Sequence, residues 1–184
     1  AVGKGLVPEA LYPQFTAQLR TLLDDADDCV GTGFLATPFL LDVAEALYGA
    51  EAALRILMQT KQPSWLFEVE QGATAIWENW FAFSEQGEPQ KCSFDHYAFG
   101  CVDEWICRRL CGIDAAKPGF SHIQIRPMDN VPFDWSRTFV CEAGAITVTR
   151  TGETLSVTIP PNTTGTVSWH GNTCEIGSGS HTFG

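Results

Sequence analysis

This 184-residue chain has few basic residues and no long hydrophobic run. No apolar stretch approaches the roughly 20 residues that cross a bilayer, so we do not expect a membrane partner. The 11 Lys and Arg residues are outnumbered by 22 Asp and Glu, which gives a net charge of −11. Nucleic-acid affinity depends on basic side chains that neutralise phosphates, so we do not expect a nucleic-acid partner either.

Cysteine pairs of the zinc-binding kind are also missing, although the chain has seven cysteines. We favour buried free thiols in a reducing compartment, because Cys101, Cys107 and Cys111 lie in apolar stretches. The alternative is a metal site that adds Cys92 and His96 to those three. Without a Cys-x2-Cys pair that alternative is weak, and no acidic loop has calcium spacing. We predict neither a metal nor a cofactor.

The first ten residues, AVGKGLVPEA, lack the apolar centre of a secretory signal peptide. A signal on a longer parent chain would not be visible in this sequence. Together with the cysteine content, this favours a cytoplasmic location over a secreted one.

The hydrophobic pattern changes near residue 120 and predicts an α plus β protein in two parts. Before that point apolar residues recur at helical spacing, and after it they alternate with polar ones. We therefore expect a helical domain over 1–119 and a small antiparallel β-sandwich over 120–184.

The first part should contain four or five amphipathic helices. Their expected positions are about 8–23, 37–48, 52–60, 63–72 and 93–111. Ser93 is the predicted N-cap of the last helix, on which Glu104 and Arg108 are spaced for an i,i+4 ion pair. The many large apolar residues on these helices must be buried against something. We expect the chain to self-associate through an exposed apolar face.

The second part shows strands separated by turns. Ile146 and Val148 alternate with polar residues, as do Val157 and Ile159. Thr151-Gly152-Glu153 joins these two runs and indicates a hairpin, whereas Pro160-Pro161-Asn162 separates the second run from the next.

A first candidate site is the stretch from Gly72 to Trp80, in which Trp77 and Trp80 flank the carboxylate of Glu78. Sugars stack their C–H faces on aromatic rings and need fixed hydrogen-bond partners for their hydroxyls. A carboxylate in low-polarity surroundings also has a raised pKa, which suits proton transfer. The alternative is that both tryptophans belong to the core and Glu78 is merely an exposed acid.

A second candidate is His96, which the pattern places in the first turn of the last predicted helix. In a functional role it hydrogen-bonds a ligand or relays a proton. In a structural role it caps the helix or lies in the core with its hydrogen bonds satisfied. The spacing of the residues favours the structural interpretation.

Three blocks and two shorter motifs resemble the α-L-rhamnosidase family of inverting glycoside hydrolases, in the expected order. They are Thr32–Pro38, Pro63–Leu66 running into Gly72–Trp80, His96–Gly100 with Glu104-Trp105, Pro118–Phe120 leading to Ile125–Pro127, and Ile159–Thr164. The similarity covers nearly the whole chain. The sequence departs from the family pattern at Ala75, Asn79 and Asp95, where threonine, arginine and asparagine are usual.

The resemblance implies that the chain is the C-terminal part of such an enzyme, with the last helices of an (α/α)6 barrel and a terminal β-sandwich. It implies that Glu78 is the general base and that His96 contacts the rhamnose. From the residues of the first candidate site we also expect Trp77 and Trp80 to bind substrate. The general acid would come from earlier barrel helices. We therefore expect a rhamnose-containing glycoside as the parent's substrate, and no activity from this chain alone.

Two other functions remain open. One is a different (α/α)-barrel glycoside hydrolase, which would release a sugar other than rhamnose. The other is a non-catalytic carbohydrate-binding or interaction module, in which residues 121–184 would bind sugar by themselves.

Overall fold

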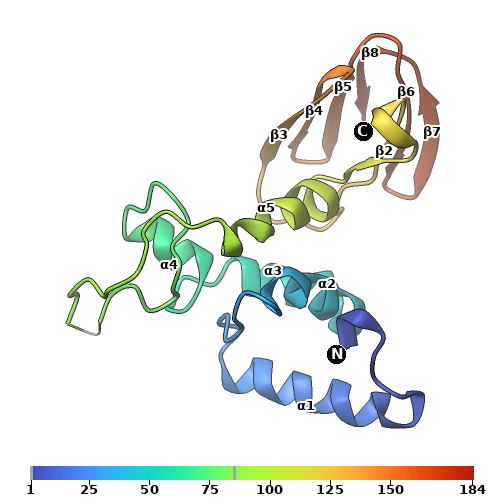
Figure 1. Ribbon diagram of the computed structural model, residues 1–184. Helices are drawn as coiled ribbons and strands as arrows, with labels where there is room; N and C mark the ends of the chain where they lie inside the picture. The colour runs from blue at the N-terminus through green and yellow to red at the C-terminus, as the bar shows by residue number, and fades with distance from the viewer. Residues whose placement is uncertain (1, 85) are drawn as a thin grey trace. The chain divides into compact units, whose positions relative to one another are not determined.

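The computed structural model describes residues 2–84 and 86–184 and divides the chain into two compact units between Val102 and Asp103 (Figure 1). The first unit is helical and the second contains the strands, which confirms the α plus β class. The boundary that we expect at residues 119 and 120 stays a prediction.

Four of the α-helices in the described residues lie in the first unit. The fifth begins at Val102, the last residue of the first unit, and continues into the second. The helices are α1 (Tyr12–Asp25), α2 (Thr37–Tyr48), α3 (Ala50–Leu57), α4 (Trp65–Glu70) and α5 (Val102–Trp105). Short 3-10 turns cover Val2–Lys4, Glu9–Leu11, Ala98–Cys101 and Pro118–Phe120, and a π-helical turn covers Ile106–Leu110. Within the described residues, no helix is long and apolar enough to span a membrane.

Local sequence signals account for the limits of α2, α3 and α4. Gly49 separates α2 from α3 with a φ of 87°, a backbone conformation that glycine adopts without steric cost. Ser64 caps α4, because its hydroxyl accepts the backbone N–H of Phe67 at 3.1 Å. The four helices predicted before residue 73 are thus confirmed.

The predicted long helix from Ser93 is wrong at its start, because helical structure begins only at Ala98. The backbone of Ser93 and His96 is engaged elsewhere. The N–H of His96 donates to the carbonyl of Ile76 at 2.8 Å, and the carbonyl of Ser93 accepts the N–H of Glu78 at 2.9 Å. These bonds hold residues 93–96 as a loop, which bends at positions 94 and 95. Further along, the predicted ion pair between Glu104 and Arg108 is present, at 2.5 Å.

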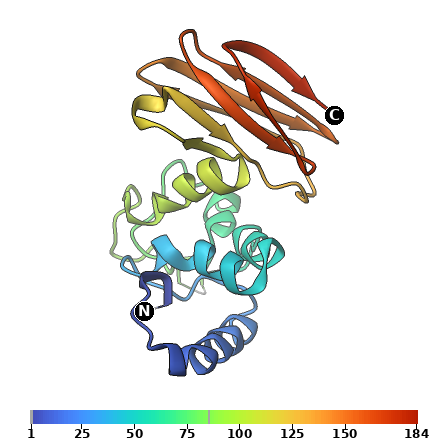
Figure 2. The ribbon, with the colours of Figure 1, turned by 90° about the vertical axis from the view of Figure 1, so that its right-hand side faces the viewer.

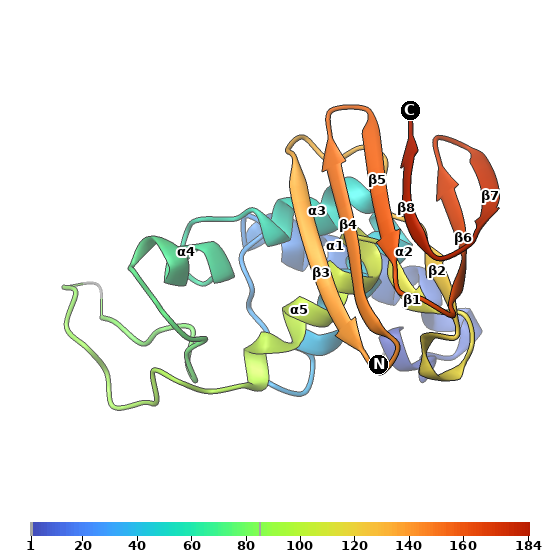
Figure 3. The ribbon, with the colours of Figure 1, turned by 90° about the horizontal axis from the view of Figure 1, so that it is seen from above.

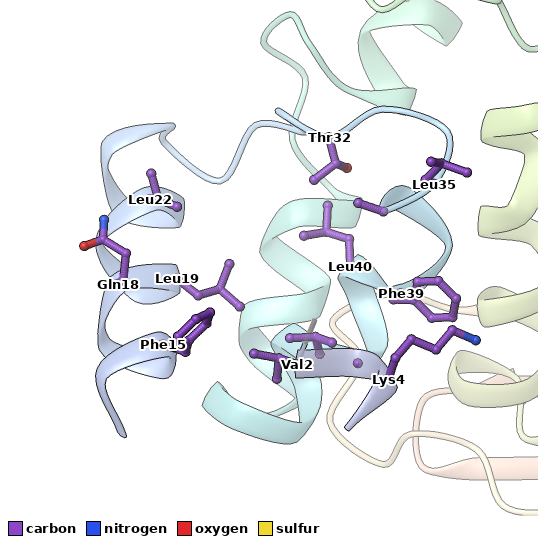
Figure 4. Close-up of a pocket in the computed structure, with 13 residues that line it drawn as sticks. Val2, Lys4, Phe15, Gln18, Leu19, Leu22, Thr32, Leu35, Phe39 and Leu40 are labelled. Carbon is purple, nitrogen blue, oxygen red and sulfur yellow. The ribbon is translucent and has the colours of Figure 1, made fainter. Parts of the chain in front are cut away.

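The helical unit has a buried core but leaves one apolar face open. Val30, Ala53 and Ile56 are fully buried. By contrast, Phe15 and Leu22 on α1 are largely exposed. They line an apolar pocket of about 460 Å³ between α1, α2 and the first turn of the chain, into which Figure 4 shows side chains from all three pointing.

The second unit contains eight strands. They are β1 (Ile113–Ala115), β2 (His122–Ile125), β3 (Trp135–Cys141), β4 (Gly144–Thr151), β5 (Thr154–Ile159), β6 (Thr164–Trp169), β7 (Asn172–Ile176) and β8 (Gly179–Phe183). One sheet has the order β1-β2-β6-β7 and the other β3-β4-β5-β8, and Figure 3 shows the second sheet as a row of neighbouring strands. The hairpin predicted at Thr151-Gly152-Glu153 is confirmed, because Thr151 pairs with Thr154.

The sandwich is not wholly antiparallel, which corrects the prediction. Strands β2 and β6 run parallel, with Ile123 opposite Gly165. Parallel neighbours need a long connection, and residues 126–163 provide one because they carry β3, β4 and β5 of the other sheet (Figure 2). All other neighbouring strands in the two sheets are antiparallel.

The two sheets bury alternate residues against each other. Ile146, Val148 and Leu155 are fully buried, as the period-two pattern predicts. Gly165 allows the close approach, since a Cβ there would lie 3.1 Å from the Ile123 carbonyl oxygen and 3.6 Å from a methyl carbon of Ile159. The second unit thus has its own hydrophobic core.

Candidate active site

Two segments of the helical unit carry the predicted site residues and are bonded to each other. Residues 76–78 follow α4, and residues 93–96 precede the turn at Ala98 (Figure 1). The Glu78 N–H donates to the Ser93 carbonyl, and the His96 N–H donates to the Ile76 carbonyl. The structure therefore places Glu78 and His96 on neighbouring backbone segments, although 18 positions separate them in the sequence.

The carboxylate of Glu78 is anchored and partly open to solvent. Its Oε2 accepts the backbone N–H of Ser93 at 2.7 Å, so two hydrogen bonds join these two residues. A carboxyl group held in one orientation can accept a hydrogen bond from a water molecule and take its proton. The pKa of the nearby Cys92 thiol is raised by burial, and the charge of Glu78 raises it further.

The ring of His96 lies between two aromatic side chains. It stacks on Phe34 with ring centroids 5.1 Å apart and on Tyr97 at 5.2 Å, with interplanar angles of 13° and 9°. The Nδ1 atom accepts the N–H of Ala98 at 3.3 Å, so a neutral ring carries its proton on Nε2. That Nε2–H group is a donor suited to a sugar hydroxyl.

Both predicted tryptophans lie in the core of the unit. Trp77 is 3% exposed and packs against Phe83 and Phe94, with ring centroids 5.2 and 5.4 Å away. Trp80 is buried, stacks on Phe99 at 4.0 Å, and donates its indole N–H to a backbone carbonyl. Neither ring has an open face, so this packing favours the alternative that both tryptophans belong to the core. Their contact with substrate stays a prediction.

Other aromatic rings do offer open surface beside His96. Tyr97 is 89% exposed and Phe34 is 43% exposed. Both residues lie in blocks that resemble the rhamnosidase family, but the sequence alone gave no reason to assign either of them a role. Exposed aromatic faces next to a histidine donor have the chemistry that a sugar ring requires.

Sequence reasoning also missed Glu68 on α4. Its side chain is 2% exposed, and Oε2 accepts the N–H of Trp77 at 3.1 Å. Burial raises its pKa to about 7, although that hydrogen bond acts to lower it. A helix-facing pattern could have identified Glu68 as buried, because it lies three residues after the buried Trp65.

The described residues contain no cluster of three His, Cys, Asp or Glu side chains that could hold a metal ion. All seven cysteines are free thiols, of which Cys29, Cys107 and Cys111 are buried. Burial raises the pKa of Cys111 to about 12, so this thiol is unreactive at neutral pH.

Comparison with known protein families identifies most of the helical unit. Residues 1–110 match the family model described as bacterial alpha-L-rhamnosidase 6 hairpin glycosidase domain. An alpha-L-rhamnosidase of Streptomyces avermitilis is 33% identical over 207 aligned residues, which cover 97% of this chain and 20% of the relative. One from Formosa agariphila is 34% identical over 162 residues, covering 80% of this chain and 17% of the relative.

A solved structure shows the same fold. The crystal structure of Streptomyces avermitilis alpha-L-rhamnosidase complexed with L-rhamnose matches with a TM-score of 0.83 and 31% identity. The match covers 96% of this chain and 20% of the solved chain. This chain thus spans about a fifth of the length of the relatives that it matches.

Proposed function

Because the chain belongs to the bacterial α-L-rhamnosidase six-hairpin glycosidase family, we propose that it forms one side of an active site that hydrolyses terminal α-L-rhamnosides. In this proposal Glu78 is the general base and His96 binds the sugar. The observation that supports it is the pair of hydrogen bonds between residues 76–78 and 93–96, which hold both side chains on adjoining segments.

The proposed reaction inverts the configuration at the anomeric carbon. Glu78 removes a proton from a water molecule, and that water attacks the anomeric carbon as the glycosidic bond breaks. A carboxylic acid on the opposite side of the sugar protonates the leaving oxygen. Inverting enzymes hold these two groups roughly 6.5–9.5 Å apart, to leave room for the water. In the proposal this acid comes from parts of the barrel that the present sequence does not include.

In the proposal, His96 and the aromatic side chains beside it bind the sugar and do not transfer protons. The role of His96 is that of a hydrogen-bond donor. Its Nε2–H group donates to a rhamnose hydroxyl, and the open faces of Phe34 and Tyr97 contact the C–H groups of the sugar. The relative from Streptomyces avermitilis was solved with L-rhamnose, which supports this choice of substrate class.

The open apolar face of the helical unit supports the further proposal that these helices are part of an (α/α)6 barrel. Phe15 and Leu22 on α1 are the kind of side chain that a neighbouring barrel helix would cover. We propose that the chain is inactive by itself and self-associates through this face. A cytoplasmic location remains a proposal, supported by the buried thiols of Cys107 and Cys111.

A hybrid enzyme tests the catalytic proposal. The matching fifth of the Streptomyces avermitilis enzyme is replaced by this chain, and release of rhamnose from an aryl rhamnoside is measured. Glu78→Gln should lower kcat by about 10²- to 10⁴-fold, the usual contribution of a general base. The matched control is Glu70→Gln, an exposed glutamate on α4 whose change should leave kcat within about twofold.

Two further readings of the same assay sharpen the result. Proton NMR of the first product should show the anomer opposite to that of the substrate. Retained configuration, or full activity in Glu78→Gln, would contradict the proposal. The 184-residue chain alone should show no turnover, and turnover that disappears with Glu78→Gln would refute its inactivity.

A further inference from the structure

Among the described residues of the helical unit, the most deeply buried ionisable side chain has no part in the proposed reaction. Glu68 is 2% exposed on α4, although a carboxyl group is costly to bury. Only one of its oxygens is satisfied: Oε2 accepts the Trp77 N–H, and Oε1 has no hydrogen-bond partner among the described residues. Burying a carboxyl group with one unsatisfied oxygen is unfavourable, so we asked which structural role Glu68 has.

The hydrogen bonds of Glu68 lead directly to Glu78. The Glu68 backbone carbonyl accepts the N–H of Ala73, and its side chain accepts the N–H of Trp77. Glu68 therefore forms hydrogen bonds with both ends of the loop 73–77 that follows α4. The next residue along, Glu78, then forms its two hydrogen bonds with Ser93.

Trp77 shows why the side-chain hydrogen bond matters. The residue is buried, so without Glu68 its N–H would lie in an apolar environment without an acceptor. An unsatisfied buried N–H is costly enough to shift the loop towards a conformation that exposes it. Such a shift would move the carboxylate attached to the following residue.

We propose that Glu68 is a positioning residue, which holds the Trp77 N–H and thereby sets the place of the Glu78 carboxylate against Ser93. The inference rests on the proposed function only for the catalytic importance of Glu78. The positioning is a property of this chain and is testable without any enzyme assay.

The ionisation of Glu68 gives the proposal a distinctive signature. Burial raises the pKa of Glu68 to about 7 although the Trp77 N–H acts to lower it, and no charged side chain of the described residues is among the causes. A carboxylate accepts the Trp77 N–H more strongly than the neutral acid does. The Trp77 amide signal should therefore move as pH passes through this value.

The experiment uses ¹⁵N-labelled 184-residue chain and two substitutions. Glu68→Gln keeps an acceptor for the Trp77 N–H but cannot ionise. Glu68→Leu has similar volume and no acceptor. Hydrogen exchange of the Trp77 amide and the pH titration of the Ser93 amide shift, which follows the Glu78 carboxylate, are measured by NMR. The indole N–H of Trp65, bonded to the Phe99 carbonyl, reports whether the unit is folded.

We expect Trp77 exchange to be about tenfold faster in Glu68→Leu and unchanged within about twofold in Glu68→Gln, since only Glu68→Leu leaves the Trp77 amide without an acceptor. The Ser93 titration should be weakened in Glu68→Leu and retained in Glu68→Gln. If Glu68→Leu is folded and keeps both the Trp77 protection and the Ser93 titration, the proposal is wrong.

If Glu68→Leu does not fold, the Gln variant decides the question. The wild-type Trp77 amide should then show an inflection near pH 7 that Glu68→Gln lacks, with the Ser93 titration intact in both. An inflection that survives in Glu68→Gln, or none in the wild type, overturns the proposal. A failure of the hybrid-enzyme assay alone would count against Glu78 as a base and would leave this result standing.

Discussion

The helical and the β units of this chain differ in how far they bury their own apolar residues. Among the described residues, every exposed large hydrophobic side chain except Val140 belongs to the helical unit. In the β unit, Ile146, Val148 and Leu155 are fully buried between the two sheets. The β unit thus completes its own core, whereas the helical unit presents an apolar face of the kind that covers another surface. The difference agrees with the proposal that the helices belong to a larger barrel.

The largest expected effect compares one leucine from each unit. Leu155→Ala on β5 should lower the free energy of unfolding of the β unit by about 2–5 kcal/mol, because the side chain is fully buried. Leu22→Ala on α1, where the side chain is 55% exposed, should change that of the helical unit by less than about 0.5 kcal/mol. Urea unfolding followed by NMR signals of each unit separately measures both. Equal losses would abolish the contrast between the units.

The second prediction concerns the buried acid of the helical unit. The folded-state pKa of Glu68 is raised to about 7 from an ordinary value of 4.5, so the folded unit holds a proton that the unfolded chain has already released between these values. Its free energy of unfolding should therefore fall as pH rises from about 4.5 to 7.5, by at most about 3 kcal/mol. Glu68→Gln should remove this slope, and the β unit provides the internal control. The opposite result would contradict the prediction: a free energy of unfolding that rises over this pH range in the wild type but not in Glu68→Gln.

A third prediction sets a buried hydroxyl of one unit beside one of the other. Ser64 caps α4, and the Thr163 hydroxyl donates to the Pro160 carbonyl at 2.6 Å. Ser64→Ala and Thr163→Val should each cost about 1 kcal/mol in their own unit, because each removes one hydrogen bond of a buried group. Similar losses would show that the units differ in apolar exposure and not in how well their polar groups are satisfied. The measurement is the same urea series, and a loss confined to one unit would contradict it.

The last prediction concerns the open face itself. Sedimentation equilibrium should show that the chain self-associates, and Phe15→Lys on α1 should weaken that association by about tenfold, since it places a charge on the apolar surface. Val140→Lys, at the exposed apolar position of the β unit, is the matched control and should leave it unchanged. A wild-type chain that stays monomeric at high concentration would show that the open face is not an association surface.

Periodicity was sufficient for most elements, because local patterns report which face of an element is buried. Ser64 marks the start of α4, and Gly152 lies in the hairpin turn between β4 and β5, as their sequence contexts predict. Ser93 shows the limit of this reasoning. Its sequence fits an N-cap, yet its N–H and carbonyl are both bonded to Glu78, 15 positions away.

The site itself was only partly accessible to sequence reasoning. Glu78 and His96 were found through their sequence blocks, and the structure shows how backbone hydrogen bonds bring those blocks together. Trp77 is a different case, because composition alone cannot tell a ring that stacks on sugar from a ring packed in a core. Glu68 was missed altogether, since an acid on a short helix ordinarily faces solvent.

The amino-acid sequence by itself determined the helical and alternating halves, the turns between strands and the family, because all of these depend on neighbouring residues or on the order of short blocks. The tertiary structure alone decided which carboxyl group is buried, which aromatic rings remain open beside His96, and that β2 and β6 run parallel. These features depend on contacts between residues that are distant along the chain. Local spacing contains no information about such contacts.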